Sequence, residues 1–342
     1  RPWNSVTHRE GERVDRFERL KAAVDGATVD RVPVSAWGHF FTEETTAVDL
    51  AGVMVRFQET YDWDYMKIHA RASYHVEGFG FRYQASTDPG QIHKTLGHPI
   101  AEPEDWRKLR PLGLDDPALA EQFRAIELIR RAVGGKVPLI MTVFSPLDAA
   151  YYLTGHDSAL LGDHLRRDPD SVAAGLAVFA ETFQPFVRRL ADSGIDGIYF
   201  SAKWSNRFKL PAEEYRRLVR PYDLQVLAEA QGMWCNMMHL CETGIYLDDF
   251  ADYPVHVFHW DNWAENNPGL GEGHAIVGKT VGGGIDIPTL TNAQAEEVER
   301  KARAAIEETG GRGLLLGPGC SIATAATPEA NLRALRHAVE PG

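Results

Sequence analysis

Cysteine is scarce in this sequence, and long apolar runs are absent. Only three of the 342 residues are cysteine, which excludes a disulfide framework and leaves at least one free thiol. Free thiols are typical of a reducing compartment, so we expect a cytoplasmic protein. No apolar run approaches the ~18 residues that cross a membrane, and the stretch RPWNSVTHREGERVDRFERL is too charged for a signal-peptide core. We therefore expect no membrane association.

Basic residues are fewer than acidic residues in this sequence. The chain has 36 Lys and Arg against 48 Asp and Glu, a formal net charge of −12. This balance repels phosphate backbones, so we expect no nucleic-acid partner. With 44% hydrophobic and 25% charged residues, the remaining composition is that of a globular protein and excludes collagen, coiled coil and disorder.

Short apolar runs alternate with stretches of helical periodicity along most of the chain. Near-continuous apolar strands separated by helices indicate a parallel sheet covered on both faces. Eight of them predict an α/β fold of the (β/α)8 TIM-barrel type in a single domain. We expect a helical lead-in over residues 1–30 and the barrel over 31–342. The predicted strands are 31–37, 64–69, 137–144, 195–200, 233–240, 255–260, 275–281 and 313–317.

Helix signals and one interruption complete the pattern. We predict helices over 211–231, 291–311 and 327–339, with Thr291 capping the second and Thr327 the third. Residues 71–112 break the rhythm with alternating aromatic and turn residues, which predicts a hairpin insertion after the second strand, over the barrel mouth.

A possible metal site follows from the barrel, whose active site lies at the carboxyl ends of the strands. His239 and Cys241 end the fifth strand two residues apart, so both side chains point the same way. Cys320 follows the eighth strand, where a barrel closes. Two thiolates and an imidazole suit Zn²⁺ with one open coordination position. The alternative is packed strand ends, since free cysteines are often buried as small apolar residues; we expect this of Cys235.

Other polar and aromatic residues follow the remaining strands. His39, Lys203, Asp261 and Asp286 come after the first, fourth, sixth and seventh strands. Each alone is an ordinary loop residue, but together they predict a polar pocket lined by aromatic rings and suited to a small molecule. The aromatic residues are Trp37, Tyr199, Trp204, Trp260 and Trp263.

One motif match is rejected. Residues 273–280 satisfy the phosphate-loop pattern GxxxxGK[ST]. That loop must follow a strand and open a helix, whereas here Lys279 and Thr280 run into a valine and three glycines, which cannot begin a stable helix. We expect no nucleotide hydrolysis.

Several segments, in order, resemble the uroporphyrinogen decarboxylase superfamily from about Phe17 onward, and the resemblance implies a (β/α)8 barrel. They include the His-x-Cys region in MMHLCETG and the TP-x-x-N region near the end. The similar segments are 137–155, 193–204, 237–244, 281–290 and 314–335.

Two departures narrow the resemblance. SAWGHFFTEE stands where decarboxylases of the family carry an arginine-rich RQAGRY loop, and LGPGCSI stands where they have NLGHGI. The cysteine instead resembles the branch of methylcobamide:coenzyme M methyltransferases and epoxyalkane:coenzyme M transferases. Their zinc motif, His-x-Cys…Cys, maps onto His239, Cys241 and Cys320.

The resemblance implies a zinc-dependent alkyl or methyl transferase. Its partners would be a small-molecule thiol and an alkyl donor or a corrinoid, the latter carried by a corrinoid protein. We expect Asp261, Asp286, His39, Tyr199 and Lys203 to orient the thiol or balance the leaving group. The aromatic residues Trp37, Trp204, Trp260 and Trp263 would line the substrate site, and Tyr74 and His75 of the insertion would close over the donor.

Two alternatives stay open. One is a metal-free decarboxylase of a tetrapyrrole, in which Asp286 or His39 handles pyrrole protons. The other is a barrel that binds a tetrapyrrole or corrinoid without turnover. The sequence names neither the thiol nor the alkyl donor, and it leaves a homo-oligomer open.

Overall fold

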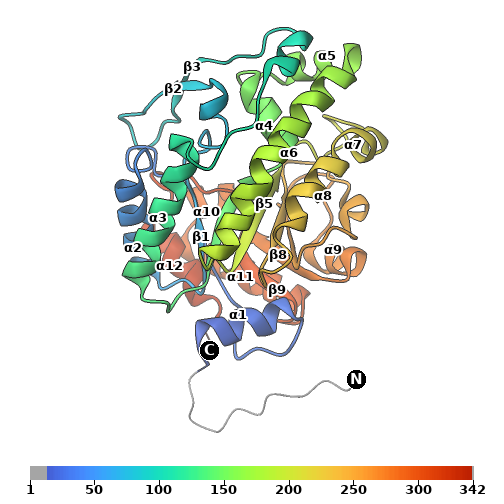
Figure 1. The fold of residues 1–342 in the computed structure, drawn as a ribbon. Coiled ribbons are helices and arrows are strands. Elements are labelled where there is room, and N and C mark those ends of the chain that lie inside the picture. Colours follow the sequence, from blue (N-terminus) through green and yellow to red (C-terminus); the bar gives the residue numbers. More distant parts are fainter. Residues whose placement is uncertain (1–13, 341–342) are drawn as a thin grey trace.

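The structure, a computed structural model, describes residues 14–340, and its centre is a parallel sheet curled into a barrel (Figure 1). Seven strands pair in the order β1-β4-β5-β6-β7-β8-β9, all parallel. The strands are β1 (Met66–Ile68), β4 (Leu139–Phe144), β5 (Gly197–Ala202), β6 (Met237–Leu240), β7 (Val257–His259), β8 (Thr280–Ile285) and β9 (Leu314–Pro318).

Residues 31–38 close the barrel between β9 and β1 without forming a regular strand. Pro33 has no N–H to donate, but its carbonyl accepts from Leu316 N at 2.9 Å, and Ser35 N donates back to Leu316 O at 3.1 Å. On the other side, Val34 O accepts from Asp64 N at 3.0 Å. The predicted first strand thus occupies the eighth strand position of the (β/α)8 barrel, but it does so as an irregular segment.

Helices cover the outside of the sheet (Figure 1). The connections follow the expected strand-helix alternation, with buried apolar faces turned to the strands. The helices are α2 (Ala47–Tyr61), α3 (Pro117–Val133), α4 (Pro146–Leu153), α5 (Ser158–Arg167), α6 (Pro169–Asp192), α7 (Ala212–Leu218), α8 (Arg220–Ala228), α9 (Leu270–Val277), α10 (Ile287–Asn292), α11 (Ala295–Glu308) and α12 (Glu329–His337), with short 3-10 turns η1 (Glu77–Phe79), η2 (Pro103–Lys108) and η3 (Leu247–Phe250). Within residues 14–340, no helix is long and apolar enough to cross a membrane.

Helix α1 (Arg16–Val24) lies within the predicted lead-in, of which residues 1–13 are outside the described residues, and it closes the amino-terminal end of the barrel (Figure 1). Its buried residues Leu20, Ala23 and Val24 pack against barrel side chains that include Tyr65 and Met237. Cys235 belongs to the same buried cluster, which confirms its expected place in the core.

The hairpin insertion after the second predicted strand is confirmed. Strands β2 (Arg82–Gln84) and β3 (Lys94–Gly97) pair antiparallel and form a separate small sheet. In Figure 1 they lie at the top of the molecule, at the end of the barrel opposite α1.

The predicted strand over 275–281 is wrong. Residues Ala275 to Val277 end helix α9, Gly278 terminates that helix with a φ of 61°, and β8 begins at Thr280. A short apolar run fits a buried helix end as well as a strand, so periodicity could not separate the two. The helix-then-strand order is the reverse of a phosphate loop and supports its rejection.

The predicted helix starts need correction. Thr291 lies inside α10, and α11 begins at Ala295 after Gln294. Thr327 does not cap α12, since Pro328 occupies that position. The helix predicted over 211–231 is two helices, α7 and α8, which meet at Val219, just before Pro221.

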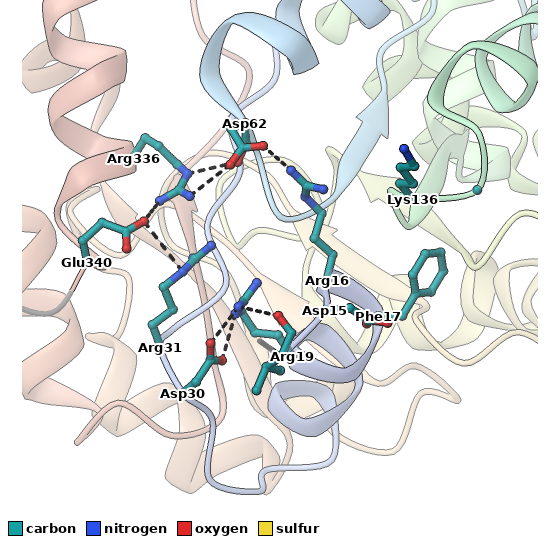
Figure 2. A pocket seen from close by; sticks show the side chains of 12 residues that line it. Asp15, Arg16, Phe17, Arg19, Asp30, Arg31, Asp62, Lys136, Arg336 and Glu340 are labelled. Carbon is teal, nitrogen blue, oxygen red and sulfur yellow. Dashed lines mark hydrogen bonds and ion pairs between the residues drawn. The ribbon is translucent and has the colours of Figure 1, made fainter. Parts of the chain in front are cut away.

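A cavity of about 650 Å³ lies at the end of the barrel that α1 closes, and Figure 2 shows that paired charges line it. Arg336 contacts both Asp62 and Glu340, and Arg19 binds Asp30 at 2.7 Å. Charged groups that neutralise one another at the amino-terminal face of a barrel are a feature of stability, not of catalysis.

Candidate metal centre

Three side chains predicted to converge do so at the carboxyl end of the barrel. His239 lies on β6, and Cys241 is the first residue after that strand. The two are two residues apart, so both side chains face the barrel axis. Cys320 arrives two residues after β9. The candidate ligand atoms of His239, Cys241 and Cys320 all lie within 4.8 Å of one another, close enough to hold one metal ion.

Gly319 allows the Cys320 loop to reach this position. A Cβ at Gly319 would lie 2.6 Å from Asp261 Cα, so only glycine lets the loop pass this close to the segment after β7. The loop is held by Gly319 N, which donates to Ile285 O at 2.9 Å, and by Ile322 N, which donates to Trp37 O at 2.9 Å.

His259, at the end of β7, fixes the tautomer of His239. Nε2 of His259 donates to Pro318 O at 2.8 Å, and burial, reinforced by His239, lowers the pKa of His259 to about 3, which keeps its ring neutral. Nδ1 of His259 therefore accepts from Nδ1 of His239 at 2.8 Å. Nε2 of His239 then carries a free lone pair, 3.6 Å from Cys320 Sγ, as a metal ligand requires. Gly282 leaves room for the His259 ring, since a Cβ there would lie 3.0 Å from it.

The two cysteines lie close enough to act on one another. Cys241 holds the pKa of the Cys320 thiol well below its usual range, and Cys320 raises the pKa of the Cys241 thiol well above it. Two sulfurs and one unprotonated imidazole nitrogen form a donor set that fits a soft or borderline divalent ion.

Tyr199 and Trp37 form the floor beneath the cluster, inside the barrel. The Tyr199 ring stacks on His239 with centroids 5.2 Å apart, and its hydroxyl lies 3.3 Å from His259 Nδ1. The Trp37 ring packs against the His259 ring, with the ring centroids 5.2 Å apart. Both rings are buried, so the floor excludes water from the inner side of the cluster.

Sequence reasoning missed Lys67 and His69, two buried polar residues on the same face of the β1 segment. Lys67 Nζ lies 2.6 Å from His69 Nδ1 and 4.2 Å from the centre of the Tyr199 ring. Burial lowers the pKa of both groups well below their usual values. Their signal in the sequence is that Lys67 and His69 alternate with apolar residues in this strand. This two-residue spacing places both side chains on the same side of the strand, inside the barrel.

His39 lines the mouth of the barrel and is held by a carboxylate that sequence reasoning also missed. Its Nδ1 lies 3.0 Å from both oxygens of Glu44, which is fully buried. His93, from the hairpin, approaches Glu44 at 3.3 Å, and Phe40 N donates to it at 2.9 Å. Burial alone would raise the pKa of Glu44, but these donors, His39 first, lower it to about 2.

The two predicted aspartates have different surroundings. Asp286 caps α10 by accepting from Thr289 N at 3.0 Å, and Lys301 Nζ binds it at 2.7 Å. Burial opposes the effect, but these bonds lower the pKa of Asp286. Asp261 lies beside Gly319, and burial raises the pKa of its carboxyl. Both of its neighbouring charges, Asp286 and Cys320, act in the same direction.

The remaining predicted aromatic residues do not gather in one place. Trp204 and Trp260 are buried, and Trp260 Nε1 donates to Pro268 O at 2.9 Å. Trp263 is half exposed at the rim, with Lys301 Nζ 4.1 Å from its ring. Tyr74 and His75 are buried at the base of the insertion, where the His75 ring stacks on Phe144 at 4.0 Å.

A cavity of about 430 Å³ opens at the barrel mouth beneath the hairpin. It brings together His39 and Lys203 of the predicted residues, whereas the three cluster residues are not part of its wall. Its lining consists of His39, Phe41, Glu44, Ala72, Ser73, Phe81, Tyr83, Ile92, His93, Thr95, Tyr151, Tyr152, His156 and Lys203.

The fold and the cluster define a (β/α)8 barrel with a sulfur-rich, metal-capable centre at its catalytic end. The model of the family "Uroporphyrinogen decarboxylase (URO-D)" matches residues 15–341, so the chain belongs to this family.

Relatives of two kinds are similar to the chain. A uroporphyrinogen decarboxylase of Sorangium cellulosum is 28% identical over 234 residues, which make up 66% of this chain and 65% of the relative. The chain thus spans about two thirds of the length of that relative. The methylcobamide:CoM methyltransferase MtbA of Methanosarcina mazei is 22% identical over 334 residues, or 92% of this chain and 95% of the relative.

Solved structures confirm the fold. A methyltransferase from Methanosarcina mazei superposes with a TM-score of 0.78 at 20% identity, covering 95% of this chain and 98% of that one. A B12-independent methionine synthase from Shewanella sp. W3-18-1 superposes with a TM-score of 0.58 at 14% identity, over 90% of this chain and 96% of that one.

Proposed function

We propose that this protein is a zinc-dependent transferase that moves an alkyl or methyl group onto a small-molecule thiol. The observation that carries the proposal is the convergence of His239, Cys241 and Cys320 on one point. Three protein ligands leave the fourth position of a tetrahedral zinc site open, as in catalytic rather than structural zinc sites.

The reaction is a nucleophilic displacement. The thiolate sulfur forms a bond to the alkyl carbon, the bond from that carbon to the leaving group breaks, and its electron pair departs with the leaving group. Zinc held at the cluster would lower the pKa of the substrate thiol, so that the thiolate exists at neutral pH.

The residues of the chain prepare this step. His259 and the Pro318 carbonyl keep Nε2 of His239 unprotonated and aimed at the cluster. Tyr199 and Trp37 exclude water from below. The cavity beneath the hairpin, at the same end of the barrel, offers space for a second substrate.

The comparison with the methylcobamide:CoM methyltransferase supports the proposal, since the similarity extends over 92% of this chain. By analogy, a corrinoid or a corrinoid protein could serve as the methyl donor. We propose a small-molecule thiol as the acceptor in either case.

Metal content tests the proposal. Purified under reducing conditions, the wild-type protein should contain about one zinc per chain and alkylate a thiol. Cys320→Ser and His239→Ala should lose most of the zinc and the transfer activity. Cys235→Ser is the matched control, because Cys235 is a core residue outside the cluster. A folded wild-type protein that contains no zinc after purification would refute the proposal.

A metal-free decarboxylase of a tetrapyrrole is the second candidate, favoured by the 28% identity to uroporphyrinogen decarboxylases. It predicts release of CO2 from a porphyrinogen, with equal rates in wild type and Cys320→Ser. A barrel that only binds a tetrapyrrole or corrinoid would show neither transfer nor CO2 release.

A further inference from the structure

The cavity beneath the hairpin is apolar over most of its wall. Aromatic rings form its sides: Phe41 from the loop before α2, Phe81 and Tyr83 from the insertion, and Tyr151 and Tyr152 from α4. Its volume of about 430 Å³ is in the ~300–1,000 Å³ range of small-molecule sites. Flat aromatic walls favour a compact molecule with an aromatic or similarly apolar body.

One charge in this wall has no opposite charge bound to it. Within residues 14–340, the ammonium of Lys203 forms no ion pair, and its hydrogen-bond partner is the Tyr152 hydroxyl at 3.4 Å. The nearby carboxylate of Asp148 already accepts two hydrogen bonds, one from the backbone Lys203 N at 2.7 Å and one from Ser201 Oγ at 3.1 Å. Burial would lower the pKa of Lys203, but Tyr152, Asp148 and the cysteines raise it, so the amine is charged at neutral pH.

The other ionisable groups in the wall form no ion pair with this ammonium. Glu44 is fully buried and directs its oxygens to His39, His93 and Phe40 N. Burial lowers the pKa of His156 to about 4, so this ring is neutral. Asp148 and the cysteines keep Lys203 charged, but they are not part of the cavity wall, so the ammonium can still donate to an anion inside the cavity.

We propose that this cavity binds the second substrate of the transferase, an anion with an aromatic or compact apolar body, and that Lys203 holds its negative group. The inference rests on the proposed function. It assigns the cavity to the alkyl donor or its leaving group rather than to the thiol, because His239, Cys241 and Cys320 are absent from its wall. Lys203 thereby determines specificity for the charge of the donor.

Binding of benzoate and of neutral benzamide to the full-length protein, with its metal as purified, tests this by isothermal titration calorimetry. The wild type should prefer benzoate. Lys203→Met should weaken benzoate binding roughly tenfold or more and leave benzamide binding unchanged, while Lys203→Arg should retain the preference. Lys209→Met is the matched control, since this lysine is in the same loop but already pairs with Glu242 at 2.6 Å.

A competition arm separates the two possible anionic ligands. Thioglycolate, an anionic thiol, should bind together with benzoate; strict competition between them would move Lys203 to the thiol site and overturn the assignment. Equal binding of benzoate and benzamide by the wild type would also overturn it. Absence of zinc with charge-selective binding intact would refute the transferase alone, because this binding assay needs no turnover.

Discussion

At the scale of single residues, the site depends on one hydrogen-bond chain that sets which nitrogen of His239 faces the sulfurs. The chain runs from the Pro318 carbonyl through His259 to His239. A ligand histidine without such a partner loses both its orientation and its preferred tautomer. His259 is not one of the three candidate ligands and acts on His239 through this bond, so its role is positioning.

His259→Phe should therefore weaken zinc binding by roughly 10- to 100-fold while the fold persists. Competition with a zinc-binding dye measures this affinity, and circular dichroism monitors the fold. His274→Asn serves as control, because His274 is exposed on α9. Unchanged zinc affinity in His259→Phe would mean that His239 needs no partner to bind the metal.

At the scale of elements, the hairpin is attached to the barrel mouth through His93 and Glu44. Burial would raise the pKa of the Glu44 carboxyl, but His39, the Phe40 N–H and His93, which lies 3.3 Å away, lower it to about 2. A carboxyl group whose pKa is lower in the folded protein stabilises the fold above its unfolded pKa, and that contribution disappears as the pH falls through the folded value.

Glu44→Gln should accordingly destabilise the protein at pH 6 by about 3 kcal/mol, and the difference from wild type should vanish between about pH 4.5 and pH 2. Denaturant unfolding at pH 6 and pH 3 provides the measurement. Glu43→Gln, whose carboxylate pairs with Arg56 on the surface, should show no such pH dependence. An equal loss at both pH values would place the effect in packing instead.

The elements also show what the sequence could predict. The strand-helix alternation, the hairpin and the meeting of His239, Cys241 and Cys320 follow from local periodicity and from the way a barrel closes. The strand over 275–281 failed because three apolar residues at a helix end have no period of their own. Lys67 and Glu44 were missed because charged residues are normally solvated, and only the tertiary structure reveals partners that make their burial tolerable.

At the scale of the whole molecule, the barrel is closed at its amino-terminal end by a buried carboxylate. Asp64 is fully buried and binds Arg19 at 3.0 Å, Arg31 at 2.6 Å and Val34 N at 2.9 Å. These bonds join α1 and the irregular closing segment to the start of β1. Removing one partner of a buried ion pair leaves the other charge without compensation, which costs far more than the pair contributes.

Asp64→Asn should lower the free energy of unfolding by about 3–5 kcal/mol without changing the zinc content of the folded protein. Urea unfolding and metal analysis of the same samples provide the two measurements. Asp62→Asn is the control, because Asp62 is exposed and its ion pairs with Arg16 and Arg336 should contribute less than about 1 kcal/mol. Similar losses in both variants would show that the closure depends on no single carboxylate.

The position of Cys320 has a consequence for the order in which the protein matures. His239 and Cys241 are synthesised long before the third ligand, which is 81 residues beyond His239 in the chain. The loop that bears Cys320 is fastened to the closing segment, through Ile322 and Trp37. A complete cluster therefore exists only after the last strand has docked against the first segment. Uptake of metal during synthesis would therefore mark the final closure of the barrel. The free energy of metal binding would stabilise the junction between β9 and the irregular closing segment.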